Sequence, residues 1–255
     1  FNTCAFCVSG GEKPVRTLSI EVIRERLKEI HRHGIKNIRV LDRTFNYNNK
    51  RAKELLNLFL EFSPDICFHL EIHPALLSEE LKQELAKLPK GLLHLEAGIQ
   101  SLREPVLEQS RRMGRLSDAL NGLKYLCALP NMETHADLIA GLPLYHLSEI
   151  FEDIHTLAEY GAGEIQLESL KLLPGTEMRR RAEELGIQYA PLPPYEVLQT
   201  REISVDELQT ARVLSRLLDG FYNTPTWQNI TRTLMLENEH FLHHFLDHLM
   251  QIGLI

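Results

Sequence analysis

The sequence predicts an α/β fold, an incomplete parallel (β/α)6 barrel followed by a C-terminal helical region. Strand patterns alternate with helical patterns up to about residue 185, and each strand-plus-helix unit takes roughly 30 residues, the size of one βαβ crossover. Repeated units of this kind imply a parallel sheet with helices packed outside it. The Pro-Leu-Pro-Pro segment at 191–194 then interrupts the pattern. We therefore assign residues 1–190 to the barrel core and residues 191–255 to the helical region.

Helices are predicted where apolar residues recur at three- and four-residue intervals, as in the first helical pattern, which Gly34 ends. The predicted helices cover residues 19–33, 50–62, 78–87, 104–109, 117–126, 147–160 and 177–185. The predicted strands cover residues 36–42, 66–72, 92–99, 133–139 and 164–170. After residue 204 only helical patterns follow. A sixth strand, the first of the barrel, is expected upstream of residue 1, since a loop that carries a cofactor should follow a supporting strand.

The composition describes an ordinary globular chain. Of its 255 residues, 44% are hydrophobic and 25% are charged, so a sizeable core is expected. A net charge of −7 argues against nucleic acid as a partner, because phosphate contacts need clustered Lys and Arg. No apolar stretch approaches the length that spans a bilayer. Four cysteines, of which only two are close together, do not make a disulfide framework, and we expect a cytoplasmic protein without a membrane partner.

Residues 1–7 (Phe-Asn-Thr-Cys-Ala-Phe-Cys) contain the cysteine pair, Cys4 and Cys7. A cysteine directly before Phe1 would complete C-x3-C-x2-C, and three thiolates at that spacing can hold three irons of a 4Fe–4S cluster. We expect that upstream cysteine, and we expect the chain as printed to hold little cluster and to be inactive by itself. A C-x-x-C pair alone also fits zinc, a redox dithiol or a haem attachment site.

Polar residues follow the predicted strands at the ends where parallel α/β barrels build their active sites. These residues are Asp42, Arg43, Thr44, Glu71, Gln100, Ser101, Asp137, Glu168 and Ser169. Any one of them has a plain explanation, because strand ends meet water. Their presence after all five strands indicates a functional rim that the cysteine loop shares.

Several segments, taken in order, resemble the radical S-adenosylmethionine (SAM) superfamily. They are residues 1–7, 41–45 (LDRTF), 96–101 (EAGIQS), 137–143 (DLIAGLP) and 170–176 (LKLLPGT). The likeness is to the branch with oxygen-independent coproporphyrinogen III oxidase and the cobalamin-binding radical SAM proteins. It covers the chain from Phe1 to about Leu185.

The resemblance implies a 4Fe–4S cluster with SAM as its cosubstrate. Cys4 and Cys7 would ligate irons together with the expected upstream cysteine, and SAM would chelate the remaining iron. Phe6 would pack beside the cluster and offer backbone groups to the adenine. The family often carries Gly-Gly-Glu after its second strand, whereas this chain has Asp42-Arg43-Thr44, where Asp42 could still pair with the methionyl ammonium.

The resemblance also implies SAM contacts later in the chain. Glu71 and Asp137 match acidic positions that contact the ribose or the amine, and Gln100 and Ser101 belong to the matching strand-end motif. Arg112 matches an arginine that pairs with the SAM carboxylate, a geometry that suits a guanidinium. Leu170 and Lys171 would lie along the adenine.

The function implied is that of an enzyme in which reductive cleavage of SAM yields a 5′-deoxyadenosyl radical that abstracts hydrogen from a substrate. The substrate, a small molecule or otherwise, is not specified by the sequence. A reducing partner such as flavodoxin or ferredoxin is expected, and cobalamin on an upstream domain is the further cofactor that this branch suggests.

Two other hypotheses for the function remain open from the sequence alone. A non-catalytic iron–sulfur or zinc module would use the cysteine pair structurally, but zinc would need two further ligands. An ordinary barrel enzyme for phosphorylated substrates is disfavoured, since the sequence has no Gly-rich phosphate loop. Four histidines, at positions 240, 243, 244 and 248, are interpreted as the polar side of an amphipathic helix.

Overall fold

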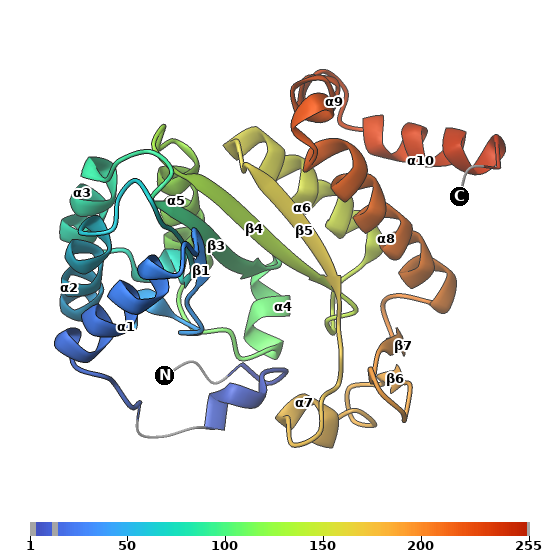
Figure 1. Ribbon diagram of the computed structural model, residues 1–255. Coiled ribbons are helices and arrows are strands. Elements are labelled where there is room, and N and C mark those ends of the chain that lie inside the picture. Colours follow the sequence, from blue (N-terminus) through green and yellow to red (C-terminus); the bar gives the residue numbers. More distant parts are fainter. Residues whose placement is uncertain (1–3, 12–14, 254–255) are drawn as a thin grey trace. The chain divides into compact units, whose positions relative to one another are not determined.

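The computed structural model of the chain describes residues 4–11 and 15–253. Residues 1–3 of the cysteine motif therefore lie outside the described part. Within that part, five parallel strands form one sheet in the order β1-β2-β3-β4-β5 (Figure 1). The strands are β1 Asn37–Arg39, β2 Cys67–Ile72, β3 Leu93–Gln100, β4 Glu133–Ala140 and β5 Glu164–Ser169. A helix follows each strand, so the predicted α/β fold with an incomplete parallel barrel is confirmed.

Helices account for most of the remaining described chain. The α-helices are α1 Ile20–Arg32, α2 Asn49–Leu60, α3 Glu79–Lys87, α4 Glu104–Gln109, α5 Leu116–Cys127, α6 Leu147–Tyr160, α7 Glu177–Arg180, α8 Val205–Leu217, α9 Pro225–Glu237 and α10 Phe241–Gln251. Short 3-10 helices occur at η1 Val8–Gly11, η2 Phe45–Tyr47 and η3 Pro74–Leu76, and a π-helical turn, η4 Leu218–Tyr222, follows α8. Ser19, Ser78 and Ser204 begin three of these helices by accepting a backbone N–H at the side-chain oxygen, the usual role of serine at a helix start.

The structure differs from the sequence-based expectation around α7. The helix predicted over 177–185 ends after one turn, and the chain continues through turns to Gly186, which has a positive φ of 68°. A small antiparallel pair, β6 Gln188–Tyr189 and β7 Val197–Gln199, follows and was not predicted. Strands of two and three residues are too short to show an alternating pattern in the sequence.

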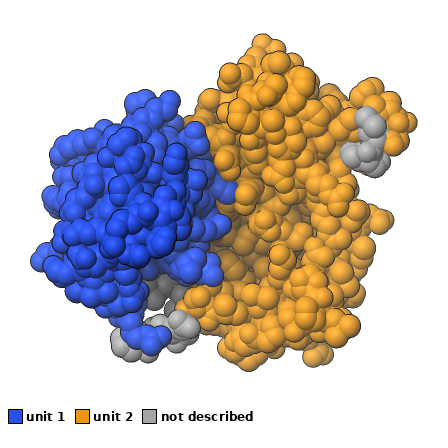
Figure 2. Space-filling model, viewed as in Figure 1, with its two compact units in different colours: residues 1, 12–98, 114–135 blue, residues 2–11, 99–113, 136–255 orange. Residues whose placement is uncertain are grey.

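The described chain divides into two compact units (Figure 2). Among the described residues, unit 1 comprises residues 15–98 and 114–135, and unit 2 comprises residues 4–11, 99–113 and 136–253. None of the described helices is both long enough and apolar enough to cross a bilayer.

Unit 1 packs α1, α2, α3 and α5 with β1, β2 and most of β3. Phe59 of α2 stacks on Phe68 of β2 with ring centroids 4.0 Å apart. Because side chains alternate across a strand, Phe68, Leu70 and Ile72 face the helices and are buried, whereas Cys67, His69 and Glu71 face the other way and are half-buried. The second set lines the face of the sheet that the helices do not cover.

Unit 2 contains the cysteine loop, α4, α6 and the C-terminal helices. In it, α8 lies beside β5 (Figure 1). Tyr222 of η4 is fully buried, and its hydroxyl donates to the carbonyl oxygen of Ala162 (2.8 Å). α8 and η4, beyond α7, thus contribute to the packed interior of this unit.

Candidate functional site

The cysteine loop is a compact turn fixed to the rest of unit 2 by its backbone. The N–H of Cys7 donates to the carbonyl oxygen of Cys4 (3.1 Å), which brings the two thiols onto one turn. Ala5 donates its N–H to the carbonyl of Ser110 (2.9 Å) and accepts the N–H of Met178 (2.8 Å). Ser110 ends α4 and Met178 lies in α7, so the segments after β3 and β5 both hold the loop.

Arg112 lies against the first thiol of this loop. Its Nη1 donates to Sγ of Cys4 over 3.7 Å, and Cys4 is only 5% exposed. Burial raises the pKa of the Cys4 thiol above its ordinary value, and the nearby guanidinium opposes that rise without cancelling it. A bound metal reverses this balance, because a coordinating thiol is deprotonated outright. The half-buried Cys7 lies on the same turn, so the two sulfurs fit the thiolate pair of an iron–sulfur ligand set.

The end of β3 carries the strained residue Gln100. Its φ is 76°, although it is not a glycine, and it is 9% exposed. Strained backbone of this kind clusters at functional sites. Ser101, which follows, donates its hydroxyl to Asp153 Oδ2 (3.4 Å) and accepts the N–H of Arg103 (3.1 Å). The Ser101 side chain therefore holds the strand end in place.

Asp153 of α6 organises the whole turn after β3. Its Oδ2 accepts the N–H of Leu102 (2.7 Å) and the hydroxyl of Tyr145 (2.6 Å), and its Oδ1 accepts Nε of Arg103 (2.9 Å). Burial raises the pKa of this carboxyl above the ordinary range for aspartate, and the hydrogen bonds from Tyr145 and Leu102 partly oppose the rise. Neither Asp153 nor Tyr145 was predicted from the sequence, because neither follows a predicted strand.

The other predicted residues of unit 2 lie on one strand, in the cysteine loop and in the segment that follows β5. Asp137 is half-buried in β4, and Phe6 is half-buried in the cysteine loop. Leu170 is buried at 3% exposure: its N–H donates to Ala140, and its carbonyl accepts from Val197. Lys171 is exposed.

In unit 1 the predicted residues form a separate group. Arg43 Nη1 lies 3.3 Å from Oε1 of Glu71, which joins the segment after β1 to the end of β2. Thr44 donates its hydroxyl to the carbonyl of Arg43 (2.8 Å), and Asp42 is exposed.

Three histidines on the uncovered face of unit 1 were also not predicted from the sequence: His69 of β2, His94 of β3 and His135 of β4. The sequence contained a signal for these histidines, because polar residues occupy every second position in β2 and at the start of β3. That alternation marks a polar sheet face.

The structure is that of an α/β protein with a parallel sheet and a cysteine pair on a loop that the segments after β3 and β5 hold. A family model described as the radical SAM superfamily matches residues 1–157, and a second, described as a protein of unknown function (DUF4080), matches residues 183–250. The chain belongs to the radical SAM superfamily.

Curated relatives and solved structures agree with this family. The chain is 24% identical over 222 residues to tRNA-2-methylthio-N(6)-dimethylallyladenosine synthase of Herpetosiphon aurantiacus. The aligned region covers 81% of this chain and 48% of the relative. The match to the same-named enzyme of Chloroflexus aurantiacus is 22% identical over 224 residues, covering 83% of this chain and 47% of the relative. The chain thus spans about half the length of these relatives.

Two solved structures share the fold. The radical SAM methyltransferase TsrM of Kitasatospora setae superposes with a TM-score of 0.63 at 17% identity, covering 76% of this chain and 40% of that one. Coproporphyrinogen III oxidase (HemN) of Escherichia coli gives a TM-score of 0.55 at 17% identity, and the superposition covers 86% of this chain and 50% of that one.

Proposed function

We propose that this chain is the catalytic core of a radical SAM enzyme in which Cys4 and Cys7 ligate a 4Fe–4S cluster, with a third thiolate expected directly before Phe1. The observation that carries the proposal is the contact of Cys4 with Arg112 on a loop fixed through Ala5. Reductive cleavage of SAM, followed by hydrogen abstraction from the substrate, is the chemistry that the cluster supplies when bound.

The residues around the loop have distinct roles in this proposal. Arg112 binds the SAM carboxylate, and its charge also favours the thiolate of Cys4. Asp137 accepts a hydrogen bond from a ribose hydroxyl. Gln100 presents its backbone at the strand end, where its strained conformation fixes the direction of the chain. A non-catalytic iron–sulfur or zinc module would not require a guanidinium beside the thiol, and this contact favours the enzyme.

Two proposals concern the full-length protein. A reductant such as flavodoxin or ferredoxin supplies the electron, and a cobalamin-binding domain upstream of this core adds a second cofactor. TsrM, a structural neighbour, has been solved with cobalamin and a [4Fe-4S] cluster bound, which supports the second proposal. Binding of hydroxocobalamin by the full-length gene product, followed by its visible absorption, tests it.

The substrate of this chain is proposed to be other than a nucleic acid. The two curated relatives are named as tRNA-modifying enzymes, but the net charge of −7 here does not favour a phosphate backbone. A gel-shift titration with bulk tRNA is expected to give no saturable binding, and a saturable complex would reverse this assignment.

The proposed SAM site is tested in the full-length, cluster-loaded gene product. Arg112→Ala and Asp137→Ala should each weaken SAM binding, since a charge-assisted hydrogen bond contributes about 1.5–3 kcal/mol, or roughly ten- to hundredfold in affinity. Iron content should not change. Cys4→Ala should abolish both the cluster and SAM cleavage.

Arg111 provides a matched control for Arg112. It is exposed and pairs with Glu177 at 2.6 Å, so Arg111→Ala should bind SAM as the parent does. Isothermal titration of SAM and iron analysis on all four variants make the comparison. Unchanged SAM affinity in both Arg112→Ala and Asp137→Ala would remove these residues from the site.

A further inference from the structure

Three histidines form a row across the uncovered sheet face of unit 1. We call His69, His94 and His135 the histidine row. The His69 and His94 rings stack with centroids 4.6 Å apart, in keeping with the β2–β3 register that pairs the two residues. The His94 and His135 rings meet edge to face at 6.0 Å. The three rings therefore form one continuous group that starts on β2 and ends on β4.

The surroundings of the row are charged. Glu96 accepts both a guanidinium N–H of Arg39 and a hydrogen bond from Nε2 of His69 (2.8 Å). Barrel interiors are normally filled by Val, Ile and Leu. Replacing such a layer with imidazoles and carboxylates is costly unless these groups are paired or bind something. The two pairings of Glu96 meet this requirement at the β2 end of the row.

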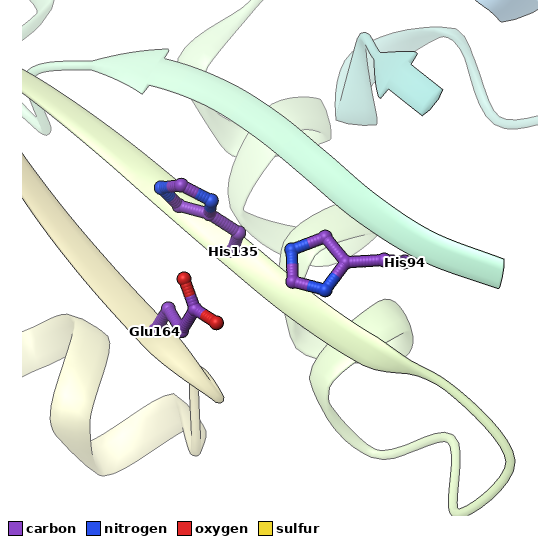
Figure 3. A group of neighbouring side chains, drawn as sticks. All are labelled: His94, His135 and Glu164. Carbon is purple, nitrogen blue, oxygen red and sulfur yellow. The ribbon is translucent and has the colours of Figure 1, made fainter. Parts of the chain in front are cut away.

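His94 and His135 have the geometry of a metal-binding pair. Their ligand nitrogens lie within 4.8 Å of each other, and Figure 3 shows the two rings reaching from neighbouring strands. Two nitrogens bound to one tetrahedral ion at zinc–nitrogen distances are about 3.4 Å apart. A small rotation of the less buried His94 ring closes the difference.

A carboxylate lies beside one ring of the pair. Oε2 of Glu133 is 3.8 Å from Nδ1 of His94. Metal-bound histidines usually direct their second ring nitrogen to a carboxylate or a carbonyl, which fixes the ring and strengthens its basicity. His135 is 4% exposed, and this burial limits the motion of the second ring.

We propose that His94 and His135 bind a divalent transition-metal ion of the Zn²⁺, Co²⁺ or Ni²⁺ class. Imidazole nitrogen suits these ions, whereas Mg²⁺ and Ca²⁺ prefer oxygen. Two protein ligands leave coordination positions for water or for an oxygen or nitrogen atom of a substrate. This site uses none of the residues of the cysteine loop, and its existence does not depend on the proposed radical SAM function.

The test uses the whole chain carrying Cys4→Ser and Cys7→Ser, so that the cysteine pair cannot bind the probe. Titration with Co²⁺ alone, followed by visible absorption, is expected to show one saturable site per chain. His94→Gln and His135→Gln on that background should each weaken binding at least tenfold. His31→Gln is the matched control in unit 1, since His31 is exposed and pairs with Asp65, and it should bind as the parent does.

A second measurement covers variants that fail to fold. On the same background, with neither histidine replaced, Zn²⁺ should protect His94 from diethyl pyrocarbonate, read by mass spectrometry. Histidines of α10 are the competing site, because His244 and His248 are one helical turn apart. Binding that survives His94→Gln but is lost in His244→Gln would overturn the proposal, as would the absence of any saturable Co²⁺ site. Cluster loading has no bearing on either outcome.

Discussion

At the scale of single residues, Asp153 is the group on which the strand-end geometry depends. It is 1% exposed and binds Tyr145, Arg103 and the backbone of Leu102. Gln100 precedes this turn with a positive φ, a conformation that costs of order 1–3 kcal/mol and persists only when its surroundings enforce it. The hydrogen bonds of Asp153 provide that enforcement.

Asp153→Ala is expected to lower the free energy of unfolding by about 3–5 kcal/mol, because it leaves buried donors unpaired. Asp153→Asn keeps the shape and should cost less. The two variants are compared by urea denaturation. Equal losses in both would contradict this and show that the charge and the second acceptor oxygen of Asp153, and not the shape of its side chain, determine stability.

The raised pKa of Asp153 gives this comparison a pH dependence. The Asp153 carboxyl keeps its proton to higher pH in the folded protein than in the unfolded chain. Its protonation therefore contributes to the free energy of unfolding fully below the ordinary pKa of aspartate, and this contribution is lost as pH rises through the raised pKa of the folded state. Asp153→Asn removes this titration. The stability of the variant should therefore fall less than that of the parent when urea melts are repeated from acidic to neutral pH.

The Cys4 thiol offers a second residue-scale prediction, in the cluster-free chain. Because Arg112 lowers the pKa that burial raises, Arg112→Met should move the pH at which Cys4 is half-alkylated upwards. Methionine keeps most of the packing while removing the charge. Mass-spectrometric alkylation rates over a pH series measure the shift, and Arg111→Met should leave it unchanged.

How much of the site the sequence revealed depends on the distance along the chain between partners. Arg112 and Cys4 were both predicted, through family motifs, and the structure brings them into contact. Asp153 was not predicted, since it lies 52 residues from Ser101. It is in the middle of a helix, where the sequence pattern predicts that an aspartate is on the surface. Only the tertiary fold reveals that it is buried.

At the scale of elements, the packing of α5 on η3 depends on Gly122. An added Cβ there would lie well inside the contact distance of the Pro74 carbonyl oxygen, and backbone cannot move aside as a side chain can. Unit 1 therefore tolerates no side chain at this helical position.

Gly122→Ala is expected to destabilise the protein by about 1–3 kcal/mol through overpacking, although alanine is the better helix former. Gly220→Ala is the control, because nothing lies within 4 Å of its added Cβ, and it should be neutral or slightly stabilising. Thermal unfolding of both variants tests this, and similar melting temperatures would contradict it.

Sequence periodicity located several elements at the residues where the structure has them. The helices at Glu104–Gln109 and Leu147–Tyr160 have the predicted bounds. The strand predicted over 36–42 is shorter, since only Asn37–Arg39 pairs with β2. The β6–β7 pair depends on contacts across the Pro-rich turn, which no local pattern encodes.

At the scale of the whole molecule, side chains of the C-terminal region bind the backbone of the segment from the end of α6 to the start of β5. Asn223 accepts the N–H of Ile165 (2.9 Å) and donates to its carbonyl (3.0 Å). Gln228 donates to the carbonyl of Gly163, and Arg232 to that of Ala158. The sequence predicted a helical region here but gave no sign of this attachment, since each bond spans more than 50 residues.

Asn223→Ala is expected to cost about 1–3 kcal/mol, the penalty for leaving buried polar groups unsatisfied. Asn229→Ala, at an exposed position of α9, is the matched control and should change stability little. Chemical denaturation compares them. Equal stability of the two variants would mean that water replaces the Asn223 amide without loss.

The attachment of Asn223 has a consequence for how copies of this chain meet one another in solution. β5 ends the row of strands, and such a margin ordinarily offers free backbone groups to which a foreign strand can add. Here the side-chain amide of Asn223 already hydrogen-bonds the backbone N–H and carbonyl of Ile165. Just beyond the strand, the N–H of Val197 donates to the carbonyl of Leu170. An incoming peptide would have to displace both before it could extend the ladder, so hydrogen bonds within the chain oppose the addition of a strand at these two places of the margin.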